Sequence, residues 1–314
     1  MASSVLFTGA SSFTGLWFAE AMAKRGLRVV APLRGSKDSY AGLRGARVAR
    51  LQACAEVVFD CPFAEPRFFE LIEAESCEIL AHHAADVDGY NKWSFDPLRA
   101  VQRNTLRADE VFAKAAERGC KAVVITGTVF EANAGGDSDG LAANPYGLSK
   151  TLTSDTLRHF AAWAGLRFGR FVVANPFGPL EEQRFCWYLF KTWLSGGVPM
   201  VQTPSYVRDN VPVSMMATAY ADYVEAMIKE STTSPTCRPS GYVMSQGGFA
   251  QLMAAEVSRR LDIHLKVDIA RQTQFSEPYI RANDQLCLLD DELPQFWDRY
   301  VQYYSALHKS GDLN

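Results

Sequence analysis

Tyr146 and Lys150 are the two residues whose types and spacing point most directly to chemistry. They lie four positions apart, so on a helix their side chains share one face. An ammonium group beside a phenol stabilises the phenolate and lowers the pKa of the tyrosine from about 10 towards neutrality. Such a pair can exchange a proton with a substrate oxygen, although the same spacing also occurs in ordinary surface pairs on helices.

Thr126 supplies a third polar group, twenty residues before Tyr146. It ends the run 121–126, which has the composition of a buried strand. Ligands of open α/β sheets bind beyond the carboxyl ends of the strands, so we expect the Thr126 hydroxyl and Tyr146 to share one crevice. The alternative is that Thr126 merely ends a strand. His82 and His83 have no acidic or cysteine ligands beside them, and we interpret them as packed strand-end residues rather than metal ligands.

Residues 8–15 lie where a first strand gives way to a first helix. Gly9 permits a tight turn there, Gly15 lets the helix pack closely on the strand, and the amino end of the helix faces a pyrophosphate. This arrangement predicts a dinucleotide site. An ordinary loop-to-helix connection has a similar sequence, so the glycine spacing alone is a weak signal.

The end of the second strand bears on the choice of cofactor. A site for NAD usually carries an acidic residue about 20 positions past the glycine turn, where it binds the ribose hydroxyls. Residues 32–37 contain no carboxylate, and Arg34 and Lys37 are cations that attract a 2′-phosphate. We therefore expect NADP(H) to be preferred, with NAD(H) as the other possibility. The alternative interpretation of Arg34 is a solvated surface residue.

These segments together resemble the extended short-chain dehydrogenase/reductase family, also called the NAD-dependent epimerase/dehydratase family. Residues 8–15 resemble its Thr-Gly-x-x-Gly-Phe-x-Gly turn, with Ser12 in place of the middle glycine. Residues 144–150, together with Thr126, resemble its Ser/Thr, Tyr and Lys triad. The likeness extends over nearly the whole chain. The sequence does not decide whether Ser12 crowds the pyrophosphate or donates a hydrogen bond to it.

The resemblance implies hydride transfer at a sugar carbon. Tyr146 would exchange a proton with the sugar oxygen, Thr126 would hydrogen-bond that oxygen, and Lys150 would tune the tyrosine and hold the nicotinamide ribose. In the family, Asp60 and Cys61 correspond to positions near the adenine, and Ala84 and Ala85 to positions near the middle of the cofactor. The expected cofactor contacts are Gly9, Ser11, Ser12, Phe13, Gly15, Arg34, Asp60, Cys61, Ala84, Ala85, Tyr146 and Lys150.

Two later segments resemble the family's substrate-binding segments. Residues 175–179 resemble the family's Asn-x-Tyr/Phe-Gly-Pro segment, and residues 208–213 resemble its Arg-Asp-x-x-x-Val segment. The arginine of the second segment binds a diphosphate in the family, and a planar, permanently charged group suits that ligand. The implied substrate is a nucleotide-diphosphate sugar. The expected substrate contacts are Thr128, Asn175, Arg208 and Arg281.

The residues after Thr126 bear on the reaction type. The family's 4,6-dehydratases carry an Asp-Glu pair there, whereas this chain has Gly127 and Thr128, so we do not expect dehydration. The leading hypothesis is an NADPH-dependent reductase of a nucleotide-diphosphate 4-keto-6-deoxyhexose, similar to CDP-abequose and CDP-paratose synthases. The alternatives are a nucleotide-sugar 4-epimerase and a catalytically silent protein that senses NADP.

The elements that position these residues follow an alternating order of strands and helices, which predicts an α/β protein with a doubly wound parallel sheet. We expect the Rossmann domain at 1–175, with a returning segment at about 209–245. A smaller, mixed substrate-binding domain is expected at 176–208 and 246–314. The expected strands are 5–8, 27–33, 56–59, 79–82, 121–126 and 167–174, and the expected helices are 13–25, 66–75, 97–118 and 146–164.

The bulk composition excludes some other classes. The chain of 314 residues is 48% hydrophobic and 21% charged, with a formal net charge of -3, so it has no broad basic field for a nucleic acid. Its seven scattered cysteines argue against a disulfide framework and a zinc site. With no leader-like or membrane-spanning run, we expect a cytoplasmic protein without a membrane partner. The family resemblance implies a homodimer formed through residues 97–118 and 146–164.

Overall fold

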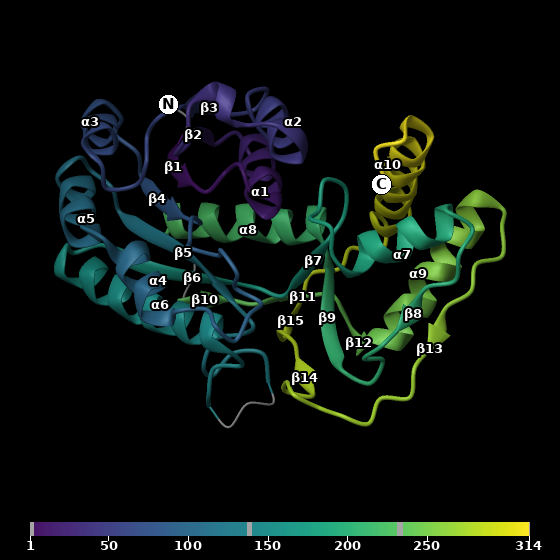
Figure 1. Cartoon of the computed structure of the whole chain (residues 1–314). Coiled ribbons are helices and arrows are strands. Elements are labelled where there is room, and N and C mark those ends of the chain that lie inside the picture. The colour runs from purple at the N-terminus through teal and green to yellow at the C-terminus, as the bar shows by residue number, and fades with distance from the viewer. Residues whose placement is uncertain (1–2, 137–139, 231–234, 314) are drawn as a thin grey trace. The chain divides into compact units, whose positions relative to one another are not determined.

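Figure 1 shows the computed structural model of the chain, which describes residues 3–136, 140–230 and 235–313. The chain forms two compact units. The first consists of the described residues of Met1–Ala134, Ser138–Val173 and Ala217–Arg238, and the second of those of Gly135–Asp137, Ala174–Met216 and Pro239–Asn314. Each unit has its own hydrophobic core.

The first unit is built on a seven-stranded sheet of order β10-β6-β5-β4-β1-β2-β3, in which every neighbouring pair is parallel (Figure 1). The predicted doubly wound α/β fold is thereby confirmed. Its strands are β1 (Ser4–Thr8), β2 (Arg28–Pro32), β3 (Glu56–Val58), β4 (Ile79–His82), β5 (Ala122–Thr128), β6 (Arg167–Val173) and β10 (Thr236–Cys237). Its helices are α1 (Phe13–Lys24), α2 (Gly42–Leu51), α3 (Pro66–Ala74), α4 (Pro97–Thr105), α5 (Ala108–Glu117), α6 (Pro145–Trp163) and, from Ala217 onward, α8 (Val213–Ile228).

Helices cover both faces of this sheet. Successive residues of a strand point to opposite faces, so Leu6 and Phe7 of β1 enter different layers. Leu6 belongs to a core shared with α3, α5 and α6. Phe7 packs instead on Tyr220 of α8, with ring centroids 6.0 Å apart, and Tyr220 stacks on Phe18 of α1 at 4.1 Å. Both faces of the strands are therefore buried, which explains why the strands are almost wholly apolar.

The predicted helix at 97–118 was wrong as a single element. The structure has two helices, α4 and α5, because Arg107 adopts a left-handed backbone with a φ of 50°. The Arg107 side chain holds this break by donating hydrogen bonds to the Ala64 carbonyl and to Glu110. Helix α2 was not predicted at all, because its apolar stripe is limited to Val48 and Leu51.

Two caps determine where the helices that carry the candidate site begin. The Ser12 hydroxyl accepts a hydrogen bond from the Gly15 amide, which fixes the start of α1. The Asn144 side chain accepts from the Gly147 amide at 2.8 Å, and Pro145 occupies the first helical position of α6. Tyr146 therefore lies in the first turn of α6, with Lys150 one turn later.

The second unit surrounds a core of aromatic rings centred on Phe177, which contacts Phe249, Phe296, Trp297 and Tyr300. Its helices are α7 (Phe185–Leu194), α9 (Gln246–Leu261) and α10 (Leu293–Ser310). Strand β9 (Val207–Pro212) pairs with β7 (Asn175–Phe177), β12 (Tyr242–Ser245) and β14 (Ile280–Arg281). Two short pairs complete it, β11 (Pro239–Ser240) with β15 (Gln285–Leu286) and β8 (Met200–Val201) with β13 (Asp268–Ile269).

The boundaries of the two units differ from the predicted domain boundaries in the segment that returns to the first unit. Only Ala217–Arg238 belongs to the first unit, rather than 209–245. The reason is strand pairing, since β9 and β12 form their ladder within the second unit. Within the part of the chain that the structure describes, no helix has the length and apolarity to cross a membrane, and no cluster of His, Cys, Asp and Glu is suited to a metal ion. The seven cysteines are free thiols.

Candidate active site

The candidate site of the first unit lies where the order of strands in the sheet reverses. β1 and β4 are neighbours at this point, with β2 and β3 on one side and β5 and β6 on the other. Thr8 at the end of β1 pairs with His82, which in turn pairs with Ile125 of β5. The glycine turn, His83 and Thr126 follow these three residues directly, so the register alone brings them together.

The glycine turn is closely packed against the segment after β4. Gly9 has a φ of +75°, and a Cβ atom on it would lie 2.7 Å from the backbone nitrogen of Ala84. A Cβ on Gly15 would lie 2.3 Å from the Gly9 carbonyl oxygen. The Ala84 amide donates to the Thr8 hydroxyl at 3.2 Å, which holds this segment in place. Both glycines are therefore required by the approach of backbone to backbone.

Ser12, which departs from the family's glycine pattern, has its hydrogen-bond partners within the protein. Its hydroxyl accepts from the Gly15 amide at 3.0 Å and donates to the Gly9 carbonyl oxygen at 2.9 Å. The same hydroxyl oxygen lies 3.0 Å from Nε2 of His83. The side chain thus serves as the cap of α1 and as a contact of His83.

His83 is more than a packed strand-end residue. Its Nδ1 lies 2.8 Å from the Thr126 hydroxyl oxygen, and its Nε2 lies 3.0 Å from the hydroxyls of both Ser12 and Thr14. Burial lowers the pKa of His83 to about 3, and the nearby charge of Lys150 acts in the same direction. The imidazole is therefore neutral at neutral pH. Its pKa could not be anticipated from the sequence, because the side chains that bury it and the hydroxyls that contact it come from other segments.

Tyr146 and Lys150 project from the first two turns of α6, as predicted. The Tyr146 ring is partly buried among Tyr90, Phe95 and Phe130, with centroid separations of 5.3, 6.0 and 6.1 Å. Lys150 is buried, and burial lowers its pKa, whereas the carboxylate of Glu131 opposes this shift. An ammonium group in this setting is a strong local electrostatic influence on a phenol one turn away.

Glu131 is a site residue that sequence reasoning missed. It accepts a hydrogen bond from the Thr128 amide at 2.8 Å and pairs with Arg170 of β6 at 3.1 Å. Burial raises the pKa of its carboxyl, while Lys150 and Arg170 favour the charged form. A Cβ atom on Gly127 would lie 2.8 Å from Oε1 of Glu131, so position 127 has little room for a side chain. An acidic residue just after an apolar strand was the signal in the sequence.

Of the remaining expected cofactor residues, Arg34 is exposed just after β2. The amides of Asp60 and Cys61 donate to the carbonyls of Gly35 and Leu33 at 3.0 and 2.9 Å, so the segments after β2 and β3 lie side by side. Asp60 is exposed with a φ of 54°, whereas the Cys61 thiol is buried. Ser11, Ala84 and Ala85 are partly buried and Phe13 is buried.

Two buried polar residues near this end of the sheet were also missed. The guanidinium of Arg47, in the unpredicted helix α2, lies 5.9 Å from the ring centroid of Phe13 and is buried. Asn104 of α4 is buried and accepts a hydrogen bond from the Asp86 amide at 2.7 Å, which fixes the segment that follows Ala85. Neither belongs to a motif that the sequence alone distinguishes.

In the second unit, the expected substrate residues Arg208 and Arg281 are neighbours in register on β9 and β14. Both donate to Oε2 of Glu277, at 2.9 and 2.8 Å. Arg208 is almost fully buried, donates to the carbonyls of Pro278 and Tyr279, and its burial lowers its pKa. Two guanidinium groups thus share the Glu277 carboxylate.

Asn175 lies on the neighbouring strand β7 and pairs in register with Asn210 of β9. Thr128, the fourth expected substrate residue, belongs to the first unit and is buried at the end of β5. The structure therefore divides the expected substrate residues between the two units, with Asn175, Arg208 and Arg281 all belonging to the second.

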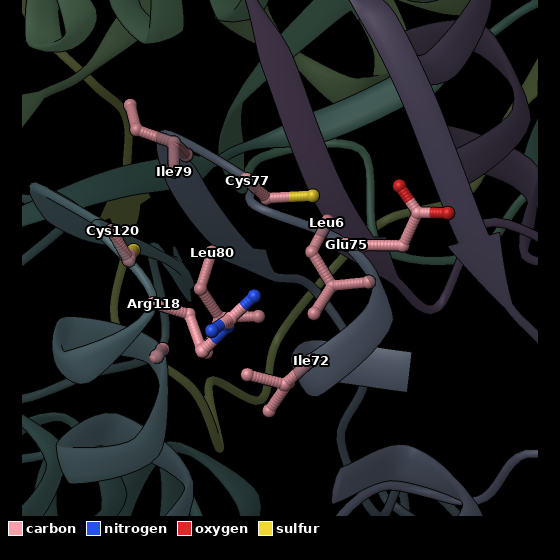
Figure 2. A pocket seen from close by; sticks show the side chains of 9 residues that line it. Leu6, Ile72, Glu75, Cys77, Ile79, Leu80, Arg118 and Cys120 are labelled. Atoms are coloured by element: carbon pink, nitrogen blue, oxygen red, sulfur yellow. The ribbon is translucent and has the colours of Figure 1, made fainter. Parts of the chain in front are cut away.

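Figure 2 shows a hollow in the first unit that does not belong to this site. It is lined mostly by apolar side chains, together with Arg118 and the thiols of Cys77 and Cys120, which precede β4 and β5. It therefore lies at the amino ends of these strands, whereas Thr126 and His83 lie towards their carboxyl ends. The Glu75 carboxylate at its edge is already paired with an arginine of β2.

A family model described as the NAD-dependent epimerase/dehydratase family matches residues 5–231 of the chain. The chain belongs to this family. The match covers the glycine turn, Thr126, Tyr146, Lys150 and Arg208, which are the residues that carried the resemblance. None of the curated proteins with which we compared the sequence matches it.

Solved structures of other proteins share the fold of this family member. A UDP-glucose 4-epimerase from Thermotoga maritima, solved with UDP-glucose, is 15% identical with a TM-score of 0.70, over 96% of this chain and 99% of that one. A UDP-N-acetylglucosamine 4-epimerase from Methanobrevibacter ruminantium, in complex with UDP-N-acetylmuramic acid, is 15% identical with a TM-score of 0.72, over 98% and 99%. A UDP-glucuronic acid 4-epimerase from Bacillus cereus, with UDP-glucuronic acid and NAD, is 13% identical with a TM-score of 0.70, over 97% and 99%.

Proposed function

We propose that this family member binds a nicotinamide dinucleotide and catalyses 4-epimerisation of a nucleotide-diphosphate sugar. The observation that carries the proposal is the placement of Thr126 on β5, with Tyr146 and the buried Lys150 on successive turns of α6. Family membership supports the cofactor class. The three solved structures described above are UDP-sugar 4-epimerases, so we favour this reaction over our initial hypothesis of a reductase.

The glycine turn fits a dinucleotide, because Gly9 turns the chain sharply into the amino end of α1, where backbone amides attract a pyrophosphate. The nicotinamide, when bound, supplies the acceptor and donor of the hydride. Tyr146 takes the proton from the sugar hydroxyl and returns it, while Thr126 hydrogen-bonds the same oxygen. The positive charge of Lys150 stabilises the Tyr146 phenolate that forms in this exchange. Arg208 and Arg281 bind the diphosphate in this proposal.

The packing at Gly127 argues against dehydration as the reaction of this chain. Elimination of water needs an acid and a base beside the reacting carbons, which the family's dehydratases supply directly after the catalytic threonine. Here Gly127 has little room for a side chain because of Glu131, and Thr128 provides no carboxyl group. The described carboxyl group nearest in sequence is that of Glu131, which is occupied by Thr128 and Arg170.

A second candidate function is the reduction of a nucleotide-diphosphate 4-keto-6-deoxyhexose by NADPH. It is favoured by Arg34, which is exposed after β2, and by the absence of a carboxylate from residues 32–37. A guanidinium here attracts the 2′-phosphate of NADP, whereas a carboxylate would repel it. An epimerase returns its hydride within one turnover, so it consumes no reduced cofactor, and this difference separates the two candidates.

The test is to incubate the purified protein with UDP-glucose, UDP-N-acetylglucosamine or UDP-glucuronic acid plus NAD, and separately with CDP- or dTDP-4-keto-6-deoxyglucose plus NADPH. Interconversion of two UDP-sugars without net change in NADH supports the epimerase, and stoichiometric loss of NADPH supports the reductase. Tyr146→Phe should abolish most of either rate, whereas Tyr188→Phe, on α7 of the second unit, should not. Cofactor binding without any turnover would contradict both candidates and indicate a cofactor sensor.

We also propose that the chain forms a homodimer through α4, α5 and α6 of the first unit. Leu98 of α4 and Trp163 of α6 support this, because both are large apolar side chains that are 69% and 73% exposed. Light scattering should give twice the mass of the chain. Leu98→Glu together with Trp163→Glu should reduce that mass to the monomer value.

A further inference from the structure

The imidazole of His83 connects the proposed cofactor turn to the proposed catalytic hydroxyl. One ring nitrogen contacts Thr126 at 2.8 Å, and the other contacts Ser12 and Thr14 at 3.0 Å. These contacts join residues that are 43, 71 and 69 positions apart in the chain. We propose that His83 is a positioning residue, which donates a hydrogen bond from Nδ1 to Thr126 and thereby leaves the Thr126 proton for the sugar oxygen. The inference rests on the proposed function.

The count of hydrogens makes this assignment specific. A neutral imidazole has one N–H and one nitrogen lone pair, and the threonine hydroxyl has one proton. If Nδ1 carries the hydrogen, Thr126 accepts from His83 and its own proton is available to a sugar oxygen. If Nε2 carries it, Thr126 must donate to Nδ1 and has only lone pairs left for the substrate. A ketone oxygen only accepts, so only the first arrangement lets Thr126 stabilise it.

The surroundings of Nε2 support the first arrangement. Ser12 and Thr14 both place a hydroxyl oxygen 3.0 Å from Nε2. The Ser12 hydroxyl donates to the Gly9 carbonyl oxygen at 2.9 Å, which leaves the Thr14 hydroxyl as the donor to the lone pair of Nε2. Nε2 can therefore act as the acceptor while Nδ1 faces Thr126 as the donor.

The position of the ring is held tightly, as a positioning role requires. Phe18 packs edge-on to the imidazole at 5.3 Å, and Phe7 lies 5.8 Å away. Burial among these rings keeps His83 neutral, and the neutral form is the one in which Nε2 can accept from the turn. In this proposal Ser12 and Thr14 of the glycine turn, through their contacts with His83, help to orient the Thr126 hydroxyl on β5.

The first test is nitrogen-15 NMR of protein labelled at histidine, with and without NAD. The chain has five histidines, and the His83 signals are assigned by their loss in His83→Gln. We expect a protonated Nδ1 and an unprotonated Nε2. A ring protonated at Nε2, or at both nitrogens, would overturn the proposal. This readout needs no substrate, so it stands even if the protein proves to have neither proposed activity.

The second test uses kcat and KM with whichever sugar nucleotide the wild-type enzyme converts. Asn at position 83 can place its amide near Nδ1 and retain a donor for Thr126, whereas Leu cannot. We expect His83→Leu to lower kcat by about 10- to 100-fold, since one aimed donor is lost, and His83→Asn to recover much of this rate. His82→Asn removes the adjacent buried imidazole, which contacts Thr8, and should leave kcat within about threefold.

A double-mutant cycle with Thr126→Val separates positioning from general loss of structure. If His83 acts through Thr126, His83→Leu should cause little further loss of kcat in the Thr126→Val protein. Fully multiplicative losses would contradict the proposal, as would equal kcat values for His83→Asn and His83→Leu. If no nucleotide sugar is converted by the wild-type protein, the proposed function fails while the NMR result still decides the tautomer.

Discussion

Oε2 of Glu131 lies 3.1 Å from Nη1 of Arg170, and the Glu131 side chain is fully buried. The pair joins the segment after β5 to the neighbouring strand β6. Because the same carboxylate also accepts from the Thr128 amide and opposes the downward pKa shift of Lys150, it supports both the local fold and the charge of a proposed catalytic lysine.

Glu131→Ala should therefore destabilise the protein strongly. The substitution leaves the Arg170 guanidinium without its carboxylate and the Thr128 amide without its side-chain acceptor. We therefore expect the free energy of unfolding to fall by about 3–5 kcal/mol. Urea denaturation measures this. Asp155→Ala is the control, because it removes an exposed partner of Arg158 and should have little effect. Equal stability of the two variants would show that the buried pair has no special role.

Gly9→Ala should cost more than Gly26→Ala, although both glycines have nearly the same left-handed backbone, with φ of +75° and +78°. At Gly26 nothing lies within 4 Å of the added Cβ, so only the backbone strain of about 1–2 kcal/mol applies. At Gly9 the Cβ would also collide with Ala84. Thermal unfolding should show a larger loss of stability for Gly9→Ala than for Gly26→Ala, and calorimetric titration of NAD and NADP should show weaker cofactor binding for Gly9→Ala alone.

Glu181→Gln should remove a dependence of stability on pH. Burial raises the pKa of Glu181 to about 8 from its usual value of 4.5, although Tyr300 and Tyr304 donate hydrogen bonds to it. The folded state therefore holds a proton that the unfolded chain has lost between these two pH values. The contribution of Glu181 to stability is complete below pH 4.5 and decreases as the pH rises towards 8, with a slope approaching about 1.4 kcal/mol per pH unit.

Denaturation curves between about pH 5 and about pH 8 would measure this slope, because a carboxyl group with a raised pKa binds its proton over that range only in the folded state. The side-chain amide oxygen introduced by Glu181→Gln can still accept hydrogen bonds from both tyrosines. The variant therefore separates the effect of the proton on stability from the effect of these hydrogen bonds. As the pH rises, we expect the difference in stability between wild type and Glu181→Gln to change steadily in favour of the variant. Parallel curves for the two proteins would refute the raised pKa.

Glu277→Gln should reveal whether Arg208 and Arg281 bind a diphosphate. The substitution removes the charge that both guanidinium groups share, so the free protein should become less stable. UDP then no longer competes with a carboxylate, and we expect it to bind several-fold more tightly and to raise the melting temperature by more than in wild type. Thermal shift with UDP, at low and high salt, tests this. A weaker response to UDP in the variant would contradict the proposed role of these arginines.

Most helices and strands of the first unit, apart from α2 and the break between α4 and α5, followed from the sequence, because periodicity and caps are local properties. β4 occupies the predicted range 79–82, and Tyr146 and Lys150 lie one turn apart on α6 because their spacing matches the helix period. The break at Arg107 could not be predicted from the local sequence, because it is stabilised by a hydrogen bond to the carbonyl of Ala64, which is distant in sequence. The limit of helix α4 is therefore a tertiary property.

The residues around the proposed catalytic group divide in the same way. The sequence by itself determined which residue types follow the strands of the sheet, including Ser12 and Thr126, and the family to which the chain is similar. Only the tertiary structure decided that His83 joins these two hydroxyls and that Glu131 meets Arg170. The physical reason is that hydrogen bonds and burial, which set the pKa and the tautomer of a side chain, arise from segments that meet only after the sheet has formed.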